Sequence, residues 1–396
     1  MKRILFISHE RKMGGANFAL YELVKELQDA GNQVSVVVLY KGCPIDKKLK
    51  KGGIKTFPCF FGWWQQPENW PFFLKWAFRL LHWLQWISVI RISKFVRKEK
   101  IQIIHSNSSV IDIGAQVAEK TGCKHVWHFR EFGAEHYHFE YMCGRDKAIE
   151  YIQNHCDKVV FISNALRDAY SDIRINNKVT VIYDGIVSEA DVKKYTDCDV
   201  HRRYDSETCN FLVAGAISPG KNQKIVLEAV KILVQDMGIK EEQFHVFFAG
   251  AVTALKESRC YMEKMEQYIN LYGLNNVSFV GFVHDMAQFR KKMHVAIIPS
   301  MYEAYGRVTL EAMLNRELVL ASNSGSNSEL IGKDERGLLF DCLNPNELAL
   351  KMHYAMCNEE TERKEKAQRY VCRFHTREEA CINVQNVYNE IMGVKM

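Results

Sequence analysis

Two glutamates, Glu303 and Glu311, bracket the predicted start of a helix. The apolar run 294–299 before them predicts a buried strand that a proline ends. Gly306 permits a tight turn, so the helix should begin near Arg307 and carry Glu311 about one turn further on. Because the N–H groups and dipole at a helix start favour an anion, a diphosphate could bind here while the carboxylates accept hydrogen bonds from sugar and ribose hydroxyls. The alternative is one helix-capping carboxylate and one solvated carboxylate.

Other predicted strand ends carry residues suited to the same chemistry. Gly14 and Gly15 open a helix after the first strand, and glycines let the backbone approach a ligand closely. This loop lacks the three glycines of a dinucleotide fingerprint, which argues against an NAD enzyme. Lys221 is expected at a helix start after the strand at 210–216, where an ammonium group would neutralise a diphosphate; the alternative is an ordinary surface lysine. Backbone groups around Val283 could hold a nucleobase.

The composition is that of a globular chain with two or three domains. It has 396 residues, 47% of them hydrophobic, which suffices for packed cores. The twelve cysteines are scattered without a Cys-x-x-Cys pair, so a cytosolic protein with reduced thiols is expected. Residues 1–183 hold 27 Lys and Arg against 17 Asp and Glu, and the remainder holds 26 against 30. The first half should therefore prefer an anionic surface, although it has no recognisable nucleic-acid-binding module.

Short apolar runs alternate with helical segments along the whole chain. Strands are expected at 3–8, 33–39, 101–105, 124–129, 158–162, 179–182, 210–216, 244–249, 277–280, 294–298, 317–321 and 337–340, and helices in the first half near 15–30, 72–99, 109–120 and 163–170. This predicts an α/β protein with two facing, doubly wound, Rossmann-like parallel-sheet domains and a ligand between them. A polar stretch sets the boundary, giving domains 1–183 and 184–376 and a terminal helix in 377–396.

An aromatic and basic stretch at 60–98 stands apart from the rest of the first domain. It contains six of the seven tryptophans, and its last part contains Arg91, Lys94, Arg97 and Lys98. Polar and charged residues recur at helical spacing within 72–90, so this is not a membrane-spanning run. Tryptophan and basic residues on one helix suit lipid headgroups, and we expect contact with an anionic membrane surface. The alternative is packing on the sheet or on another subunit.

The ordered set of loops resembles the retaining, nucleotide-sugar-dependent glycosyltransferases of family 4 (group 1), which have the GT-B fold. The matching elements are Gly14-Gly15, Ala214 to Lys221, Glu303-x7-Glu311 with Leu310-Glu311-Ala312-Met313, and Gly325 to Glu329. The resemblance implies that Glu311 binds the ribose hydroxyls and that Lys221 stabilises the leaving phosphate. It also implies that the donor hexose and diphosphate contact Glu303 and the amides of Ala304, Tyr305 and Gly306.

The same resemblance assigns residues of the first domain. His128, which closes a predicted strand, matches the family's histidine near the donor sugar, and Arg130 and Glu131 would face the donor or the acceptor. The alternative for His128 is a histidine at the edge of the core. The terminal helix would cross back onto the first domain, and the chemistry would need no metal.

Two positions depart from the family pattern. An arginine is usual five residues before the lysine, and here that position is Ala216. Our hypothesis is that Arg307, between the two glutamates, supplies the missing charge. Asp184 replaces a usual asparagine, and only local consequences for the turn are expected.

Metal binding is the alternative function for a group of nearby residues: His125, His128, His136, His138, Glu131 and Glu135. Their spacing matches no compact zinc pattern, and the family resemblance implies metal-independent chemistry, so neither a metal nor another cofactor is expected.

The sequence therefore predicts a glycosyltransferase that moves a hexose-type sugar from a nucleoside diphosphate, with UDP favoured, to an acceptor hydroxyl, and the resemblance implies that it is retaining and metal-independent. Lys221 would stabilise the leaving diphosphate, and Glu303 and His128 would position the oxocarbenium-like transition state. The stretch at 60–98 favours a lipid-linked saccharide acceptor in bacterial surface polysaccharide biosynthesis and a cytoplasmic protein peripheral on the inner face of the membrane. The alternatives are a sugar-nucleotide epimerase of the same fold and a non-catalytic nucleotide-sugar-binding protein.

Overall fold

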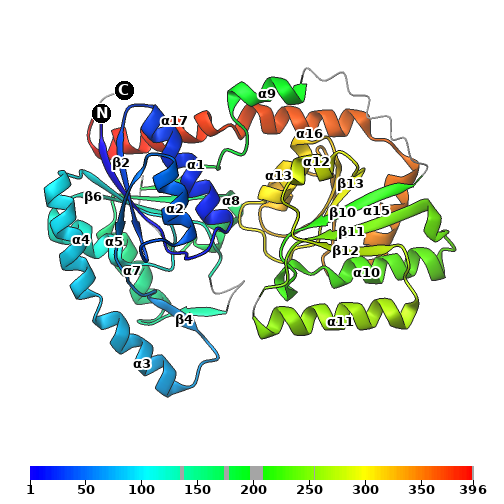
Figure 1. Ribbon diagram of the computed structural model, residues 1–396, viewed down its shortest axis with the longest axis horizontal. Coiled ribbons are helices and arrows are strands. Elements are labelled where there is room, and N and C mark those ends of the chain that lie inside the picture. The colour runs from blue at the N-terminus through cyan, green and yellow to red at the C-terminus, as the bar shows by residue number, and fades with distance from the viewer. Residues whose placement is uncertain (134–137, 174–177, 197–207, 254, 395–396) are drawn as a thin grey trace. The chain divides into compact units, whose positions relative to one another are not determined.

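The computed structural model describes residues 1–133, 138–173, 178–196, 208–253 and 255–394. The chain divides into two compact units, the first made of Met1–Ser188 with His375–Met396 and the second of Glu189–Phe374 (Figure 1). The predicted boundary at residue 184 falls shortly before this division. Each unit is built on its own parallel sheet.

The first unit has a seven-stranded parallel sheet in the order β3-β2-β1-β5-β6-β8-β9. These strands are β1 (Arg3–Ile7), β2 (Gln33–Val38), β3 (Lys55–Pro58), β5 (Ile103–Ser106), β6 (Lys124–Phe129), β8 (Lys158–Phe161) and β9 (Val179–Val181). A separate antiparallel pair joins β4 (Gln65–Pro67) to β7 (Phe139–Tyr141). The strands β3, β4 and β7 are absent from the sequence-based prediction, because runs of only four, three and three residues are too short to show a recognisable hydrophobic pattern.

Helices cover both faces of this sheet. Alternate side chains of β1 enter two different cores: Ile4 and Phe6 lie with residues of α1 (Gly15–Asp29) and α17 (Arg377–Ile391), and Leu5 and Ile7 lie with residues of α4 (Trp86–Glu99) and α5 (Ile113–Thr121). Strands buried on both faces have nearly continuous apolar sequences, which is why these strands are predictable. The other helices in the described part of the unit are α2 (Pro44–Lys51), α3 (Phe72–Trp83), α7 (Arg145–His155) and α8 (Asn164–Ala169).

The prediction of one helix at 72–99 is wrong, because the chain turns at Leu84 and Gln85 between α3 and α4. The buried Gln85 side chain donates a hydrogen bond to Asp112 Oδ1 at 2.8 Å, which holds the turn against α5. After the turn, α4 buries Val89, Ile92, Ser93 and Val96, whereas α3 buries none of its residues. The turn therefore separates a helix that belongs to the core from one that lies outside it.

The terminal helix α17 belongs to the first unit and packs on α1. Arg377 pairs with Glu22 at 2.9 Å, and Lys158 pairs with Glu390 at 2.7 Å. Tyr388 is fully buried in the core shared with β1 and β2.

The second unit has a six-stranded parallel sheet in the order β12-β11-β10-β13-β14-β15. Its strands are β10 (Cys209–Ala214), β11 (Phe244–Ala249), β12 (Val277–Gly281), β13 (Val295–Ile298), β14 (Leu318–Ser322) and β15 (Leu338–Phe340). Its α-helices are α9 (Glu189–Thr196), α10 (Lys224–Lys231), α11 (Lys256–Tyr272), α12 (Met286–Arg290), α13 (Arg307–Leu314), α14 (Asn327–Ile331), α15 (Pro345–Cys357) and α16 (Thr361–Phe374). The two doubly wound parallel sheets confirm the predicted fold class.

The strand order reverses at the first strand of each sheet. In the first unit the chain moves outward from β1 to β3 and returns to β5, and in the second it moves from β10 to β12 and returns to β13. The loops that leave two such neighbouring strands in opposite directions form a crevice, where ligands of this sheet type bind. Gly14 and Gly15 follow β1, Lys221 follows β10 and Glu303 follows β13.

Candidate functional site

In the second unit, Lys221 and Glu303 form an ion pair at the reversal of strand order. Lys221 ends the 3-10 turn Pro219–Lys221 that follows β10, and Glu303 lies in the loop after β13. Lys221 Nζ donates a hydrogen bond to Glu303 Oε2 at 2.8 Å. Burial raises the pKa of Glu303, but the charge and hydrogen bond of Lys221, with hydrogen bonds from Ser300 and the Gly306 backbone, lower it more, so the net pKa is lowered. Glu303 is therefore a carboxylate at neutral pH.

Two glycines fix the loop that carries Glu303. Gly306 has φ +83°, and a Cβ there would lie 2.6 Å from Leu330 Cδ1. Gly325, in the loop after β14, has φ +56°, and a Cβ there would lie 2.2 Å from the Glu303 carbonyl oxygen. The Ser326 amide donates to that same oxygen at 2.8 Å. Gly325 and Ser326, directly before α14, therefore support the backbone of Glu303.

Glu311 lies between two arginines. Arg307 Nε donates to Glu311 Oε1 at 3.1 Å, and Arg290 Nη2 lies 3.8 Å from Glu311 Oε2. Arg290 is buried and pairs in addition with both carboxylate oxygens of the buried Glu317, at 2.9 and 2.8 Å. Sequence reasoning missed Arg290, because an arginine next to two lysines gives no sign of being buried.

The other predicted residues of the second unit take three different positions. Ala304 is half-buried and Tyr305 is buried beside Glu303. Ala216 is exposed, on the loop that leads to Lys221. Val283 is half-buried and follows the edge strand β12. Because β11 and β10 lie between β12 and β13, Val283 lies away from the Lys221–Glu303 pair.

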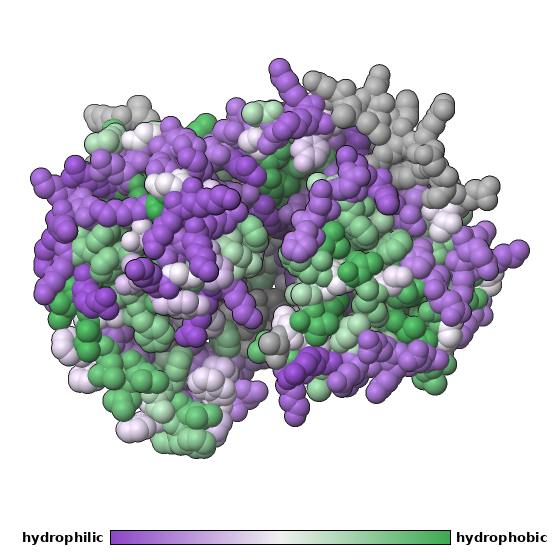
Figure 2. Space-filling model, viewed as in Figure 1, coloured by the Kyte–Doolittle hydropathy of each residue, from purple (hydrophilic) through white to green (hydrophobic). Residues whose placement is uncertain are grey.

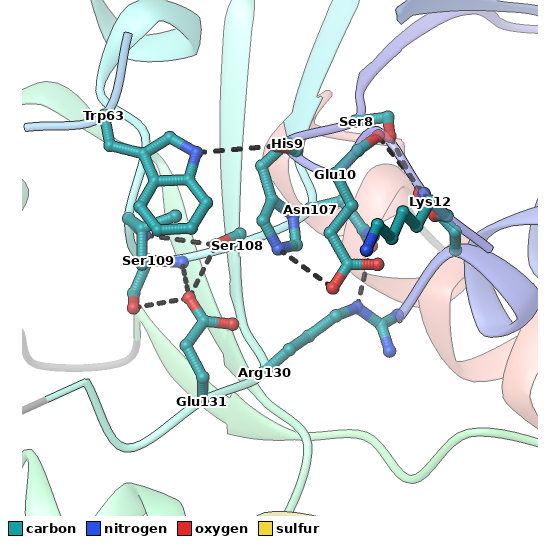
Figure 3. Close-up of polar contacts among 12 residues, drawn as sticks. Ser8, His9, Glu10, Lys12, Trp63, Asn107, Ser108, Ser109, Arg130 and Glu131 are labelled. Atoms are coloured by element: carbon teal, nitrogen blue, oxygen red, sulfur yellow. Dashed lines mark hydrogen bonds and ion pairs between the residues drawn. The ribbon is translucent and has the colours of Figure 1, made fainter. Parts of the chain in front are cut away.

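In the first unit, polar side chains gather after β1, β5 and β6 (Figure 3). Glu131 Oε1 accepts hydrogen bonds from Ser108 Oγ at 2.5 Å and from the amide and hydroxyl of Ser109, both at 2.7 Å. The predicted residue Glu131 is thus held by the loop that follows β5. The indole of Trp63 lies beside this group and donates to the His9 carbonyl oxygen at 3.5 Å.

Arg130 is buried and is held by its neighbours. Its guanidinium donates to Asn107 Oδ1 at 2.7 Å and to the two carboxylate oxygens of Asp184 at 2.6 and 3.1 Å. The expectation that Asp184 has only local consequences for a turn is therefore wrong, since its carboxylate pairs with a buried cation 54 residues away in the sequence.

His128 is buried on β6 beside Arg130. Burial lowers its pKa well below the usual value, and the charges of Arg130 and His105 lower it further. The imidazole is therefore neutral at physiological pH. A neutral imidazole exchanges hydrogen bonds with hydroxyl groups without bringing a buried charge into the site.

Sequence reasoning also missed a role for His9 and Glu10, although the polar run Ser8-His9-Glu10 directly after an apolar strand was a usable signal. Burial raises the pKa of Glu10, and Glu131 adds to this, against the opposing effects of His9 and Arg130. A Cβ on Gly14 would lie 2.9 Å from Glu10 Oε2, a contact that a movement of the Glu10 side chain can relieve, whereas a Cβ on Gly15 would meet nothing within 4 Å.

Several buried polar atoms of this cluster have no hydrogen-bond partner within the described ranges: His9 Nδ1, Glu10 Oε2, Asn107 Nδ2 and His128 Nε2. Buried polar atoms are normally paired, so unpaired ones that converge at the carboxyl ends of strands indicate a ligand site. Donor and acceptor atoms are both present, as a polyhydroxylated ligand requires.

Of the residues named above as an alternative metal site, His136 and Glu135 lie outside the described residues. Elsewhere, over the residues that the structure covers, no three His, Cys, Asp or Glu side chains gather as a metal-binding group.

The aromatic stretch at 60–98 is divided by the fold. Phe61 and Trp64 are buried, and the Trp64 ring stacks on Trp127 with centroids 5.3 Å apart, so the prediction of membrane contact is wrong for these two residues. Most of the large apolar side chains from Phe72 to Ile87 are exposed. No helix in the described part of the chain is long and apolar enough to span a bilayer.

Comparisons with known proteins give consistent matches along the chain. The family model described as Glycosyltransferase Family 4 matches residues 13–190, and the model described as Glycosyl transferases group 1 matches residues 203–371. The chain is 24% identical over 313 residues to an uncharacterized glycosyltransferase of Methanocaldococcus jannaschii, covering 77% of this chain and 80% of that protein. It is 23% identical over 249 residues to the capsular polysaccharide biosynthesis glycosyltransferase CapH of Staphylococcus aureus, covering 60% and 64% of the two chains.

The fold is also that of a solved structure. HepE of Anabaena, crystallised in complex with UDP and glucose, superimposes with a TM-score of 0.75 at 21% identity, over 98% of this chain and 100% of HepE.

Proposed function

The chain belongs to the family 4 (group 1) glycosyltransferases and has their GT-B fold, and we propose that it transfers a hexose-type sugar from a UDP-linked donor to an acceptor hydroxyl with retention of anomeric configuration. The UDP and glucose bound by HepE support the choice of donor class. The role of CapH in capsular polysaccharide biosynthesis supports a saccharide acceptor.

The observation that carries this proposal is the Lys221–Glu303 pair at 2.8 Å beside the start of α13. The first N–H groups of a helix have no partner inside it, and together with the dipole they favour a phosphate. Lys221 adds a cation at the same place, so a leaving diphosphate would gain both charge neutralisation and hydrogen bonds. Glu303 remains ionised and accepts hydrogen bonds from sugar hydroxyls.

The transfer step is proposed to follow a front-face displacement. The bond between the anomeric carbon and the diphosphate breaks with its electron pair on the leaving oxygen, and the acceptor oxygen attacks from the same side. The acceptor hydroxyl gives its proton to the departing phosphate oxygen. The protein holds the groups in place and stabilises negative charge through Lys221, so no metal is required.

In the first unit, the unpaired atoms of His9, Glu10 and Asn107 support a hydroxyl-rich ligand. The Trp63 ring beside them offers an apolar face of the kind on which sugar rings pack. We assign this cluster, together with Glu131, to the sugar hydroxyls of the acceptor or the donor.

The donor assignment is tested with Lys221→Ala and a matched control, Lys231→Ala. The side chains of Lys221 and Lys231 are exposed to similar degrees, 29% and 27%, and Lys231 also forms an ion pair, with Asp236 at 3.0 Å. A thermal-shift screen of UDP and GDP sugars identifies the donor, because a ligand of the folded state raises Tm. We expect Lys221→Ala to lower the transfer rate about 100-fold or more and Lys231→Ala to preserve it. Equal rates in both variants would contradict the assignment.

Product analysis separates this function from the two alternatives. The configuration of the new glycosidic bond, read by NMR, tests retention. An epimerised donor without any transfer product would indicate an epimerase. Donor binding without turnover in the wild type and in Lys221→Ala would indicate a binding protein.

We further propose that the acceptor is lipid-linked and that the enzyme works on the cytoplasmic face of a membrane. Figure 2 shows hydrophobic residues gathered on the surface over α3, where Trp76 and Trp83 are 60% and 68% exposed. The exposed residues of the following helix α4 include Arg91, Lys94, Arg97 and Lys98. An apolar helix face followed by basic residues fits the boundary between acyl chains and anionic headgroups, where each basic residue contributes about 1 kcal/mol.

Flotation with vesicles of phosphatidylglycerol and phosphatidylcholine tests this surface. We expect the wild type to float at low salt and Trp76→Ser/Trp83→Ser to float much less. Leu271→Ser, which removes an exposed apolar residue from α11 of the second unit, serves as the control and should float like the wild type. Unchanged flotation of the double variant would assign the exposed face to another partner.

A further inference from the structure

A chain of buried polar groups runs from His128 to the C-terminal helix. Nδ1 of His128 on β6 lies 3.2 Å from Nε2 of His105 on β5, and Nδ1 of His105 lies 2.7 Å from the hydroxyl of Tyr388 on α17. All three side chains are buried. A neutral imidazole carries one ring hydrogen, so the hydrogen bonds of this series can all point from Tyr388 toward His128 or all point from His128 toward Tyr388.

Arg130 distinguishes the two orders. Its Nη2 lies 3.4 Å from Nδ1 of His128, and a guanidinium group can donate hydrogen bonds but cannot accept them. Nδ1 of His128 therefore accepts. In the reverse order this nitrogen would carry a hydrogen that faces an N–H of Arg130, and the contact would be repulsive.

The order of the whole chain follows from this one contact. His105 donates from Nε2 to His128, and its Nδ1 accepts from the Tyr388 hydroxyl, which can act as a donor. The ring hydrogen of His128 then lies on Nε2. That nitrogen is buried and has no hydrogen-bond partner among the residues described, so its hydrogen is available to a bound ligand.

Arg130 is held in the orientation that this contact requires. Its Nε donates to Asn107 Oδ1 at 2.7 Å, and Nη1 and Nη2 donate to the two oxygens of Asp184 at 2.6 and 3.1 Å. A planar guanidinium fixed on both edges has no freedom to turn away from His128.

We propose that Arg130 is a positioning residue that fixes His128 as a hydrogen-bond donor through Nε2. The ligand group that His128 meets is then an oxygen with a free lone pair, such as a sugar hydroxyl, and Nε2 cannot accept a proton while this order holds. The inference rests on the proposed function and on the expectation, from the family resemblance, that His128 lies near the donor sugar. Arg130 therefore acts by setting the tautomer of His128, an effect that direct contact between Arg130 and the acceptor substrate would not produce.

The test reads the ring hydrogens directly by long-range ¹H–¹⁵N correlation on the full-length protein with ¹⁵N-labelled histidine. The spectrum of His128→Gln identifies the signals of His128. The double variant Arg130→Met/Asp184→Asn removes the guanidinium that donates to His128 Nδ1 and leaves no unpaired buried carboxylate. Asp184→Asn alone is the matched control, because it keeps Arg130.

We expect the hydrogen on Nε2 of His128 in the wild type and in Asp184→Asn, and a mixture of both tautomers in the double variant, with a transfer rate about tenfold lower, the effect of about one hydrogen bond. A hydrogen on Nδ1 in the wild type would overturn the inference, as would an unchanged Nε2–H tautomer in the double variant. If the double variant does not fold, the wild-type spectrum still decides the order. The spectrum needs no substrate, so an Nε2–H tautomer in a protein without transfer activity would refute the proposed function and leave the hydrogen order intact.

Discussion

Replacing Gly325 with alanine should displace Glu303 and reduce sugar transfer, although no residue of the proposed chemistry is itself replaced. The added Cβ would lie 2.2 Å from the Glu303 carbonyl oxygen and 2.8 Å from its amide nitrogen. Both atoms belong to the backbone, so no side-chain rotation can relieve the contact. Gly325 also has φ +56°, a conformation that alanine adopts only at a cost.

The size of the effect follows from these distances. Carbon and oxygen need about 3.2–3.4 Å, so the Glu303 backbone must move by about 1 Å. The left-handed conformation costs about 1 kcal/mol of folding free energy, and the overpacking costs about 1–3 kcal/mol more. A 1 Å displacement of a positioning group lowers the rate about 100-fold.

Gly273→Ala is the matched control, because Gly273 has φ +61° and a Cβ there would meet nothing within 4 Å. Both variants should lose about 1 kcal/mol for the conformation, but only Gly325→Ala should lose activity. Urea unfolding measures the first effect, and the transfer rate at saturating donor measures the second. If the two variants keep equal activity, the backbone at Gly325 does not position Glu303 and the reasoning fails.

Three further outcomes are expected. Arg307→Ala should raise the KM for the sugar donor about tenfold, if Arg307 supplies the charge missing at Ala216. An unchanged KM would refute the idea that Arg307 takes over this role. The pKa of His125 is lowered to about 4, mainly by burial. As pH falls below 6.5, the unfolded chain therefore takes up a proton at this residue before the folded chain does. The difference in proton uptake lowers the free energy of unfolding by about 3 kcal/mol between pH 6.5 and 4. In urea unfolding, the stability of His125→Asn should therefore depend less steeply on pH than that of the wild type, and an identical dependence would contradict this account. Transfer should persist after EDTA treatment, and loss of activity that Mg²⁺ restores would argue against charge neutralisation by Lys221 alone.

The sequence by itself determined the two series of strands and helices, the positions of Glu303 and Lys221 in the connections that follow strands, and that of Glu311 in the helix after Glu303. Local patterns suffice for this, because burial on both faces of a parallel sheet leaves a continuous apolar run, and a glycine or proline marks where the run ends. The same local patterns failed at residues 84–85, where a polar anchor to Asp112 turns the chain although the helical periodicity continues.

Only the tertiary structure decided which of these residues meet. Lys221 and Glu303 are 82 positions apart, Arg130 and Asp184 are 54 apart, and His105 and Tyr388 are 283 apart. Such contacts depend on the order of strands in the sheet and on the return of the C-terminal helix, and neither leaves a periodic trace in the chain. The protonation of His128 depends on one distance from a guanidinium, and residue spacing cannot encode it.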